Sequence, residues 1–343
     1  MSKRDQVGHS SDRTHEPRRT LELFRRRFPS GGRLVPSSPQ KVVILLGTHN
    51  GAEFLPEQLQ SFRDQCHSNW ELLVSDDGST DQTVEVIEAF AKLVPQRVTL
   101  RQGPRQEFWK NFLSMVRLND MGGEFFAYSD QDDIWGSEKL AKAVDWLATI
   151  PKGRPALYFG RTILIGRDGR PLGLSPLFER AASFQNALVQ NIGGGNTMVF
   201  NRATKSLLAA TPEDVSLIAH DWWTYQLVTG AGGVAHYDPW PTVKYRQHQQ
   251  NLIGSNAGLR QRSLRLRAFV GGRVIMWNDI NIKALNRMRS LLTSSNLANL
   301  DRFACARKSP LPKRLYLLWK AGAYRQSAFE NIGIFVGSLF GRI

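Results

Sequence analysis

The sequence predicts an α/β fold in which a mostly parallel sheet is flanked by helices on both faces. Three observations predict it. Short runs that are apolar on both faces alternate along the chain with segments of helical periodicity. The runs end in glycine, small polar or acidic residues, as strands do at the ligand-binding edge of an open α/β sheet. The 343 residues are 41% hydrophobic and 10% aromatic, which suffices for a packed core and is unlike a disordered chain.

The first half of the chain predicts these elements in order. Residues 41–46 (KVVILL) form a strand closed by a glycine-containing turn, residues 53–66 a helix, and residues 70–75 (WELLVS) a second buried strand. A strand, a helix and a strand in succession make a βαβ unit. Ser79, Thr80 and Asp81 then supply capping side chains for a second helix. The segments that follow predict a strand, a helix and a strand, in that order: 98–103, 111–118 and 124–130.

The pattern changes after about residue 155. Residues 156–165 and 233–248 are strand-like, residues 191–200 are rich in glycine, and a helix is expected to end before residue 220. Helical periodicity returns in three basic segments: 259–270, 282–292 and 313–326. We therefore expect one composite α/β domain followed by a helical extension.

The formal charge of +15 lies at the two ends of the chain. Residues 1–34 hold nine Lys/Arg and four Asp/Glu, residues 255–343 hold sixteen and three, and the residues between hold 20 and 23. This distribution predicts a disordered basic N-terminal tail over 1–34, a slightly acidic folded domain over 35–254, and a basic, mainly helical region over 255–343.

Cys66 and Cys305 lie far apart and match no metal-binding spacing, so we expect two buried thiols in a reducing compartment. The N-terminal residues contain no apolar run typical of a signal peptide, and the sequence contains no uncharged apolar stretch of 18 residues. These features predict a cytoplasmic protein that does not span a membrane. The Arg, Lys and aromatic residues of the C-terminal region fit either helices lying on an anionic membrane surface or a helical subdomain packed on the core.

Acidic side chains follow two of the predicted strands. Asp130 ends the strand at 124–130 and Asp132 and Asp133 follow it, while Asp76 and Asp77 follow the strand at 70–75. Carboxylates this close repel one another, so the cluster needs a cation or hydrogen-bond donors to offset the repulsion. A solvated turn and a helix cap are the plainer interpretations of the two groups.

The segment around Asp221 and the residue His248 are two further candidates for functional residues. Asp221 lies between His220 and the pair Trp222 and Trp223, where partial desolvation would raise its basicity towards that of a general base. A helix cap with tryptophans in the core explains the same residues. His248 taken alone is typical of a surface or core histidine.

Six motifs in order carry a resemblance to a known family. They are GTHNG (47–51), SDDGSTD (75–81), SDQDDIW (129–135), GGNTMVFNR (194–202), HDWW (220–223) and YRQHQQN (245–251). The set resembles glycosyltransferase family 2, and within it the bacterial rhamnosyltransferase-type members, over about residues 40–254. The resemblance implies the GT-A fold, a Rossmann-like mixed sheet flanked by helices, and inverting transfer of a sugar from a nucleotide donor.

The resemblance also implies roles for individual residues. The nucleotide-sugar donor would contact Thr48, Asn50, Gly51, Asp76, Asp77 and Asp130. Asp132 and His248 would hold Mg²⁺ or Mn²⁺ on the diphosphate. Asp221 would be the catalytic base, in a His-Asp pair where many members have Glu-Asp. We assign Gly194, Trp222 and Trp223 to the acceptor side.

The predicted function is transfer of L-rhamnose from dTDP-rhamnose to a hydroxyl of a glycan or lipid-linked glycan, in cell-surface polysaccharide synthesis. The same fold with UDP-glucose, UDP-galactose or another donor is an alternative. The charge of +15 alone would suggest a nucleic-acid-binding protein, but the net acidic middle of the chain argues against a nucleic-acid partner. A catalytically silent scaffold would not explain three separate acidic sites. The enzyme is expected to lie on the inner face of the cytoplasmic membrane, as a peripheral protein.

Overall fold

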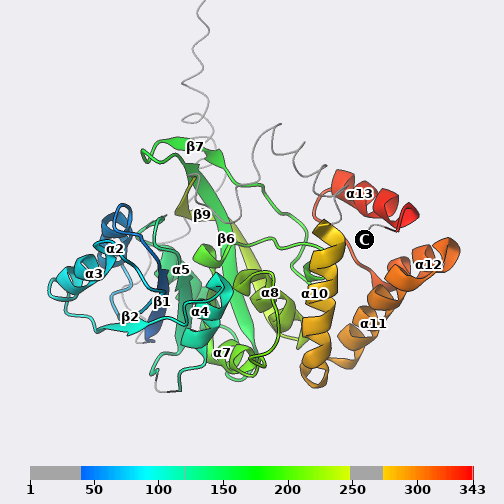
Figure 1. The fold of residues 1–343 in the computed structure, drawn as a ribbon, viewed down its shortest axis with the longest axis horizontal. Coiled ribbons are helices and arrows are strands. Elements are labelled where there is room, and N and C mark those ends of the chain that lie inside the picture. The colour runs from blue at the N-terminus through cyan, green and yellow to red at the C-terminus, as the bar shows by residue number, and fades with distance from the viewer. Residues whose placement is uncertain (1–39, 120, 248–272, 342) are drawn as a thin grey trace, which may run out of the picture.

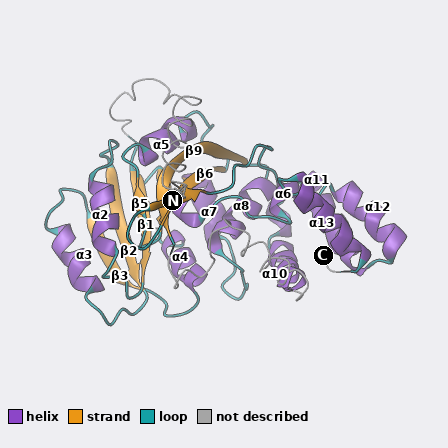
Figure 2. Ribbon diagram, turned by 90° about the horizontal axis from the view of Figure 1, so that it is seen from above, coloured by secondary structure: helices purple, strands orange, loops and turns teal. Residues whose placement is uncertain are grey.

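The computed structural model describes residues 40–119, 121–247, 273–341 and 343, which form a mixed sheet between two helical layers with a helical extension at one end (Figures 1 and 2). The predicted N-terminal tail, the helical segment at 259–270 and His248 lie outside these residues.

The sheet begins as a parallel unit and ends as a mixed one. Its strands are β1 (Val42–Thr48), β2 (Trp70–Asp76), β3 (Val98–Gln102), β4 (Phe125–Ser129), β5 (Ile134–Trp135), β6 (Ala156–Ile165), β7 (Pro171–Leu174), β8 (Val199–Asn201) and β9 (Val234–Arg246). They are ordered β3-β2-β1-β4-β8-β6-β9-β5, and β7 pairs with β6. The strands β3, β2, β1 and β4 run parallel, and β8 is antiparallel to both of its neighbours.

Helices cover both faces of this sheet. The part of the chain that contains the sheet also contains α2 (Leu55–Arg63), α3 (Thr83–Ala91), α4 (Phe108–Val116), α5 (Lys139–Leu147), α6 (Phe184–Ala187), α7 (Arg202–Ala209) and α8 (His220–Gly230), with a 3₁₀ turn at Gly195–Thr197. The extension contains α10 (Arg273–Arg287), α11 (Ser294–Lys308), α12 (Leu311–Ala321) and α13 (Ala328–Leu339), with a 3₁₀ turn at Arg289–Leu291. Figure 2 shows α5 on one side of the sheet and α4 on the other.

Alternate side chains of the central strands pack into two separate hydrophobic cores, one on each face of the sheet. On β1, Val42 and Ile44 pack with α2, α3 and α5, whereas Val43 and Leu45 pack with α4 and α8. All four are at most 1% exposed. The apolar run of β1 is therefore buried on both faces, as the sequence predicted for a central parallel strand.

The C-terminal helices extend the second of these cores. Leu285 of α10, Phe303 of α11 and Leu318 of α12 belong to the cluster that includes Trp223 of α8. The side chain of Asn296 donates to the carbonyl oxygens of Thr229 and Gly230, both at 3.0 Å, where α8 ends. The inner faces of these helices therefore pack as a subdomain on the catalytic core, which is one of the two interpretations that the sequence allowed.

Some sequence expectations were wrong in detail. Helix α7 ends at Ala209, before the HDWW segment as expected, but that segment begins helix α8, which the segment-by-segment prediction did not contain. Helices α11 and α13 were not predicted. Cys66 and Cys305 are free but exposed, and not buried as expected. No helix in the described part of the chain is long and apolar enough to cross a membrane.

Candidate active site

The carboxyl ends of four parallel strands gather the predicted polar groups at one edge of the sheet. Thr48 at the end of β1 pairs in register with Asp76 at the end of β2, which pairs with Gln102 of β3. On the other side, β4 ends at Ser129, and the acidic segment follows directly. Open α/β sheets bind ligands at this edge.

Asp76 organises the turn after β2. Its carboxylate accepts the Thr48 hydroxyl (2.9 Å), the Ser79 hydroxyl (2.5 Å) and the backbone N–H groups of Gly78 (3.2 Å) and Ser79 (2.9 Å). Burial opposes ionisation of Asp76, but these bonds outweigh it and lower its pKa. The structure thus brings Thr48 and Asp76 together, with both carboxylate oxygens engaged within the turn.

The loop after β1 is held to the acidic segment by Gln131. Its side-chain oxygen accepts the His49 N–H at 2.8 Å, and its side-chain nitrogen donates to the His49 carbonyl at 3.0 Å. A Cβ on Gly51 would lie 2.2 Å from the Gln131 Oε1, so a side chain at position 51 would collide with the Gln131 side chain that makes these hydrogen bonds. Sequence reasoning assigned no role to Gln131.

Asn50 and Asp77 complete the predicted nucleotide side. Asn50 adopts a left-handed backbone with φ of 48°, and its side-chain oxygen accepts the Thr80 N–H at 2.8 Å. Asp77 accepts the Arg105 N–H at 2.6 Å. The loops after β1 and β2 therefore form one hydrogen-bonded surface, and contact with a nucleotide stays a prediction.

The acidic segment after β4 is electrostatically strained. Burial, together with the negative charges of Asp132 and Asp221, raises the pKa of Asp130 to about 7. Burial and the charges of Asp132 and Asp130 raise the pKa of Asp133 well above its usual range. Such shifts mark carboxylates whose repulsion a bound cation would relieve. Asp221 acts on Asp130 across the fold, so the structure brings the predicted base and the acidic segment together.

Asp133 is the buried anchor of this segment. It is 0% exposed and accepts the Asn196 side-chain N–H and the Arg246 backbone N–H, at 2.5 and 3.1 Å. Lys139 is also 0% exposed, with its Nζ 3.6 Å from the Trp135 ring centre. Burial lowers the pKa of Lys139 to about 7, although the nearby charge of Asp133 opposes this shift.

Arg246 fastens the end of β9 to the same segment. Its side chain is 1% exposed and donates to the carbonyl oxygens of Asp132 (2.9 Å) and Arg167 (2.8 Å) and to Glu57 (2.7 Å). Asn196, Lys139 and Arg246 were missed as site residues. The motif positions of Asn196 and Arg246 were the available signal, but their partners lie 63 and 113 residues away in sequence.

Asp221 lies in the first turn of α8, half-buried. Its two oxygens accept the N–H groups of Trp222 (2.6 Å) and Gly195 (3.2 Å), and Asn191 adds a side-chain hydrogen bond. Burial raises the pKa of Asp221 to about 6, although these three bonds oppose the shift. A carboxylate with this pKa is ionised at neutral pH and is a stronger base than an exposed one.

The two tryptophans do not lie as the acceptor assignment requires. Trp222 is 7% exposed, donates to the Ala187 carbonyl at 2.7 Å and packs edge-on against Trp277 of α10. Trp223 is 1% exposed and donates to the Thr211 hydroxyl at 2.9 Å. Neither ring presents an open face to a sugar, so the helix start with core tryptophans describes this motif better. Gly194 is exposed, and its acceptor role stays a prediction.

The glycine-rich turn joins the two halves of the site. Gly195 donates to Asp221, and the next residue, Asn196, donates to Asp133. His220 lies behind this turn, stacked on Phe112 with ring centroids 3.9 Å apart. Burial lowers the pKa of His220 to about 3, so its ring is neutral and adds no charge beside Asp221. The turn therefore fixes the distance between Asp221, the predicted base, and the acidic segment.

Gly195→Ala tests this turn. A Cβ would lie 2.5 Å from the His220 Nε2, so the ring or the turn must move. We expect a loss of about 1–3 kcal/mol of stability and, because Asp221 is displaced, a fall of about 100-fold in the transfer rate. Thermal melting and steady-state kinetics measure both. Gly122→Ala, where no described atom lies within 4 Å, is the control. Wild-type melting and kinetics for Gly195→Ala would contradict the positioning role.

The residues present fit a divalent cation in part. Asp130 and Asp132 are half-buried oxygen ligands beside a fully buried Asp133, and their mutual repulsion suits a hard cation. Across the ranges 40–119, 121–247 and 273–341, no three His, Cys, Asp or Glu side chains are placed to hold a metal. The predicted ligand His248 lies outside those ranges. Of the two predicted metal ligands, Asp132 therefore lies among the described residues, with Asp130 beside it.

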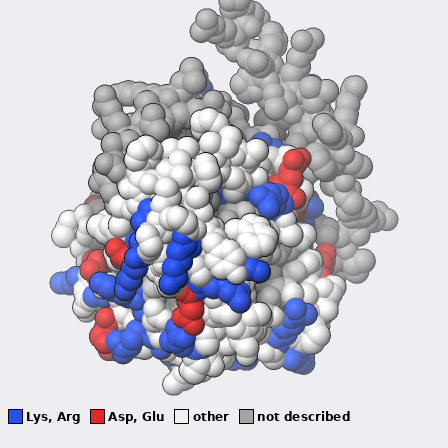
Figure 3. Space-filling model, turned by 90° about the vertical axis from the view of Figure 1, so that its right-hand side faces the viewer, with Lys and Arg blue, Asp and Glu red and all other residues white. Residues whose placement is uncertain are grey.

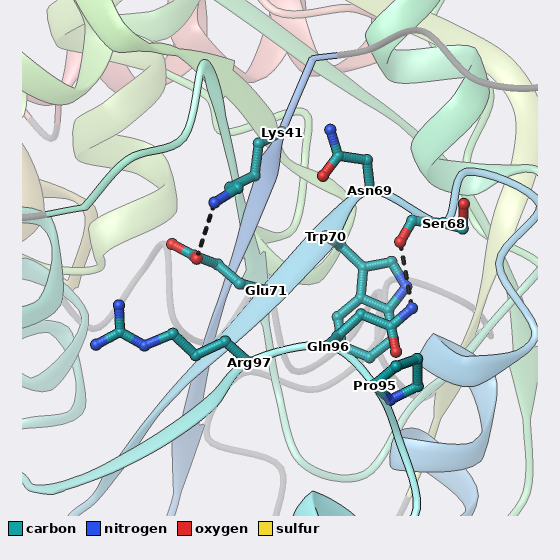
Figure 4. A pocket seen from close by; sticks show the side chains of 8 residues that line it. All are labelled: Lys41, Ser68, Asn69, Trp70, Glu71, Pro95, Gln96 and Arg97. Carbon is teal, nitrogen blue, oxygen red and sulfur yellow. Dashed lines mark hydrogen bonds and ion pairs between the residues drawn. The ribbon is translucent and has the colours of Figure 1, made fainter.

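A surface hollow lies at the opposite edge of the sheet. It is lined by Lys41, Ser68, Asn69, Trp70, Glu71, Pro95, Gln96 and Arg97 (Figure 4). These residues precede or begin β1, β2 and β3, whereas the acidic groups follow the other ends of these strands. Lys41 and Glu71 pair across it at 3.4 Å. The hollow is thus separate from the candidate active site.

The mixed sheet and the acidic strand-end site define an α/β protein of the nucleotide-sugar transferase type. Residues 43–208 match the family model of glycosyl transferase family 2. Residues 43–208 therefore form a glycosyltransferase family 2 domain with the GT-A fold, which confirms the family resemblance. The motifs at 220–223 and 245–251 lie outside the matched residues.

Two curated relatives and one solved structure show the range of similar proteins. The dTDP-rhamnosyl transferase RfbG of Shigella flexneri is 27% identical over 235 residues, covering 64% of this chain and 78% of that protein. The putative teichuronic acid biosynthesis glycosyltransferase TuaG of Bacillus subtilis is 25% identical over 47% of this chain and 62% of its own. The mannosyltransferase PcManGT from Pyrobaculum calidifontis, in complex with GDP-Man and Mn²⁺, aligns with 94% of this chain and 95% of its own, at 19% identity and a TM-score of 0.49.

Proposed function

We propose that this glycosyltransferase transfers a sugar from a nucleotide donor to a hydroxyl of a glycan or lipid-linked glycan, with inversion at the anomeric carbon. The observation that carries the proposal is the placement of Asp221. Its negative charge acts on Asp130, and one turn of chain, Gly195–Asn196, links it to the acidic segment. A base and a donor-binding acidic segment thus face the same space.

The chain's own residues supply most of the chemistry. Asp221 removes the proton from the acceptor hydroxyl while that oxygen attacks the anomeric carbon. The N–H groups of Trp222 and Gly195 fix the carboxylate orientation. The loops at Thr48–Gly51 and Asp76–Asp77 would hold the nucleotide, and Asp130 the ribose or sugar. A divalent cation bound by Asp132 would neutralise charge on the departing diphosphate.

We propose dTDP-L-rhamnose as the donor and cell-surface polysaccharide synthesis as the process. Support comes from the relative named as a dTDP-rhamnosyl transferase, which is 27% identical over 64% of this chain. The relative named for teichuronic acid biosynthesis supports the process. UDP-glucose, UDP-galactose and other donors are the alternative, because the residues that contact the sugar ring are not identified.

A panel of nucleotide sugars tests the proposal without knowledge of the acceptor. The protein is melted with each donor and either Mg²⁺ or Mn²⁺, and slow donor hydrolysis is measured in parallel. We expect dTDP-rhamnose with a metal to raise the melting temperature more than the UDP-sugars do. Stronger stabilisation by a UDP-sugar would replace the donor assignment. Absence of metal-dependent stabilisation and hydrolysis with every donor would contradict the proposed activity.

The pH dependence tests the base assignment. Since burial raises the pKa of Asp221 to about 6, the carboxylate is protonated below that pH and cannot accept a proton. We expect kcat/KM to rise about tenfold per pH unit up to about pH 6 and to level off above it. Rates from about pH 4.5 to about pH 8.5 measure the profile. A flat profile over this range would exclude Asp221 as the titrating base.

We also propose that the enzyme works at the inner face of the cytoplasmic membrane, where it would meet a lipid-linked acceptor. The contact would be peripheral and would use the basic C-terminal helices. The surface that supports this placement belongs to α12 and α13.

A further inference from the structure

Helix α13 turns an apolar face outwards. Six large hydrophobic side chains in or directly after this helix are exposed: Phe329, Ile332, Phe335, Val336, Leu339 and Phe340. Phe329 is 83% exposed and Phe340 is 74% exposed. The inward side carries Gly337 and Ser338, both buried. A helix of a soluble domain normally buries its apolar face and exposes its polar one, so α13 has the reverse arrangement.

The neighbouring helix α12 turns a basic and aromatic face outwards. Lys313, Tyr316, Trp319 and Lys320 are all exposed and follow helical spacing, and Trp319 is 72% exposed. The Lys320 Nζ lies 4.9 Å from the Trp319 ring centre. Aromatic rings beside lysines are typical of side chains at a membrane–water interface, where the ring lies at headgroup depth and the ammonium meets the phosphates.

The two helices are fixed to each other. Arg314 of α12 donates to the Ser338 carbonyl of α13 at 2.6 Å and to the Ser309 carbonyl at 3.2 Å. The basic face of α12 and the apolar face of α13 therefore lie on two neighbouring helices that are bonded to each other, and we call these exposed side chains together the α12–α13 surface.

The charge around this surface is mainly positive. Three acidic residues occur in the described part of the extension, and each is paired with an arginine: Asp279 with Arg307, Asp301 with Arg289 and Glu330 with Arg325. Figure 3 shows this end of the molecule, where Lys and Arg side chains border a broad uncharged surface and acidic ones are fewer. Among the ion pairs of the described residues, none includes Lys313 or Lys320 of α12.

We propose that the α12–α13 surface binds an anionic lipid bilayer, with the apolar side chains of α13 inserted among the acyl chains and the lysines of α12 at the lipid phosphates. Exposed apolar area and unneutralised lysines on one surface complement an interface that is apolar below and anionic above. A second copy of the chain is a poorer occupant, since a symmetric contact through this surface would bring the same lysines together.

Cosedimentation of the full-length chain with vesicles tests the proposal. Vesicles of phosphatidylcholine with about 30% phosphatidylglycerol are compared with pure phosphatidylcholine at low and high salt. We expect binding to the anionic vesicles, weakened by salt. The triple variant Phe329→Ser/Ile332→Ser/Phe340→Ser should lose at least about tenfold in partitioning. Lys313→Gln/Lys320→Gln should lose about tenfold on anionic vesicles.

A matched control carries the same kind of change elsewhere. Leu93 and Leu172 are 65% and 61% exposed, and Leu93→Ser/Leu172→Ser should bind as the wild type does. Thermal melting shows whether each variant is folded. Equal binding by the triple variant, or failure of the wild type to bind anionic vesicles, would overturn the proposal. So would a dimer in sedimentation velocity that the triple variant converts to a monomer. The assay contains no nucleotide sugar, so its outcome is independent of the proposed glycosyl transfer.

Discussion

Replacing Asp221 by asparagine is expected to slow glycosyl transfer about 1,000-fold, because the amide cannot take the proton from the acceptor hydroxyl. Donor affinity should change by less than about threefold, since Asp221 lies in α8 and not in the strand-end loops predicted to hold the nucleotide. The effect should therefore fall on kcat. Steady-state rates and metal-dependent donor binding, measured on the same preparation, separate the two quantities.

The hydrogen bonds of Asp221 also indicate how much Asp221→Asn should lower the free energy of unfolding. Both Asp221 oxygens accept backbone N–H groups, and an asparagine keeps only one acceptor oxygen. We expect a loss of about 1 kcal/mol from the Gly195 bond, far less than would unfold the protein. Asp301→Asn makes the same chemical change on α11 and should leave the rate unaltered. Turnover of Asp221→Asn near the wild-type rate would assign the base to another residue.

The strands of the catalytic half could be predicted because their signal is local. A run such as Val42–Leu46 is apolar at every position, and such a run stays buried only between two helical layers. The observed β1, β2 and β4 start and end within a few residues of the expected bounds. The acidic groups at their ends then meet automatically, since parallel strands place all their carboxyl ends at one edge.

The start of α8 could not be predicted in the same way. Its HDWWTYQLVTG sequence is buried almost all round, so it lacks the one-sided apolar pattern that identifies a surface helix. Sequence reasoning placed Trp222 and Trp223 on a sugar because aromatic rings bind sugars. The packing of α10 against Trp222, and the Thr211 hydroxyl that meets Trp223, come from distant parts of the chain. The burial of Trp222 and Trp223 therefore depends on tertiary contacts that the local sequence does not show.

The contacts that hold the acidic segment were hidden for the same reason. The Gln131 side chain makes two hydrogen bonds with the backbone of His49, 82 residues earlier. Arg246 reaches Glu57, 189 residues away, and its own backbone N–H meets Asp133. A single sequence shows which residues are chemically able to take part, but only the fold shows that these supporting residues converge on one segment.

Replacing Asp132 by alanine is expected to weaken metal-dependent binding of the nucleoside diphosphate on the order of a hundredfold. Asp132 adds its negative charge to those of Asp130 and Asp133, and it raises the pKa of both neighbours. A cation bound there would bridge this charge and the diphosphate, so removal of one carboxylate weakens the bridge. Binding without metal is weak from the start and should change little.

Titration calorimetry with the nucleoside diphosphate, at saturating Mn²⁺ and again with a chelator, separates metal-dependent binding from metal-independent binding. Asp132→Ala should lose affinity only in the presence of metal. Asp301→Ala removes a carboxylate from α11 and should bind as the wild type does in both conditions. An equal loss with and without metal would mean that Asp132 shapes the loop and does not hold the cation.

The melting temperature of Asp132→Ala should rise or stay level, because the substitution removes part of the electrostatic repulsion on Asp130 and Asp133. A marked fall in melting temperature would therefore also count against the cation assignment and in favour of a structural role.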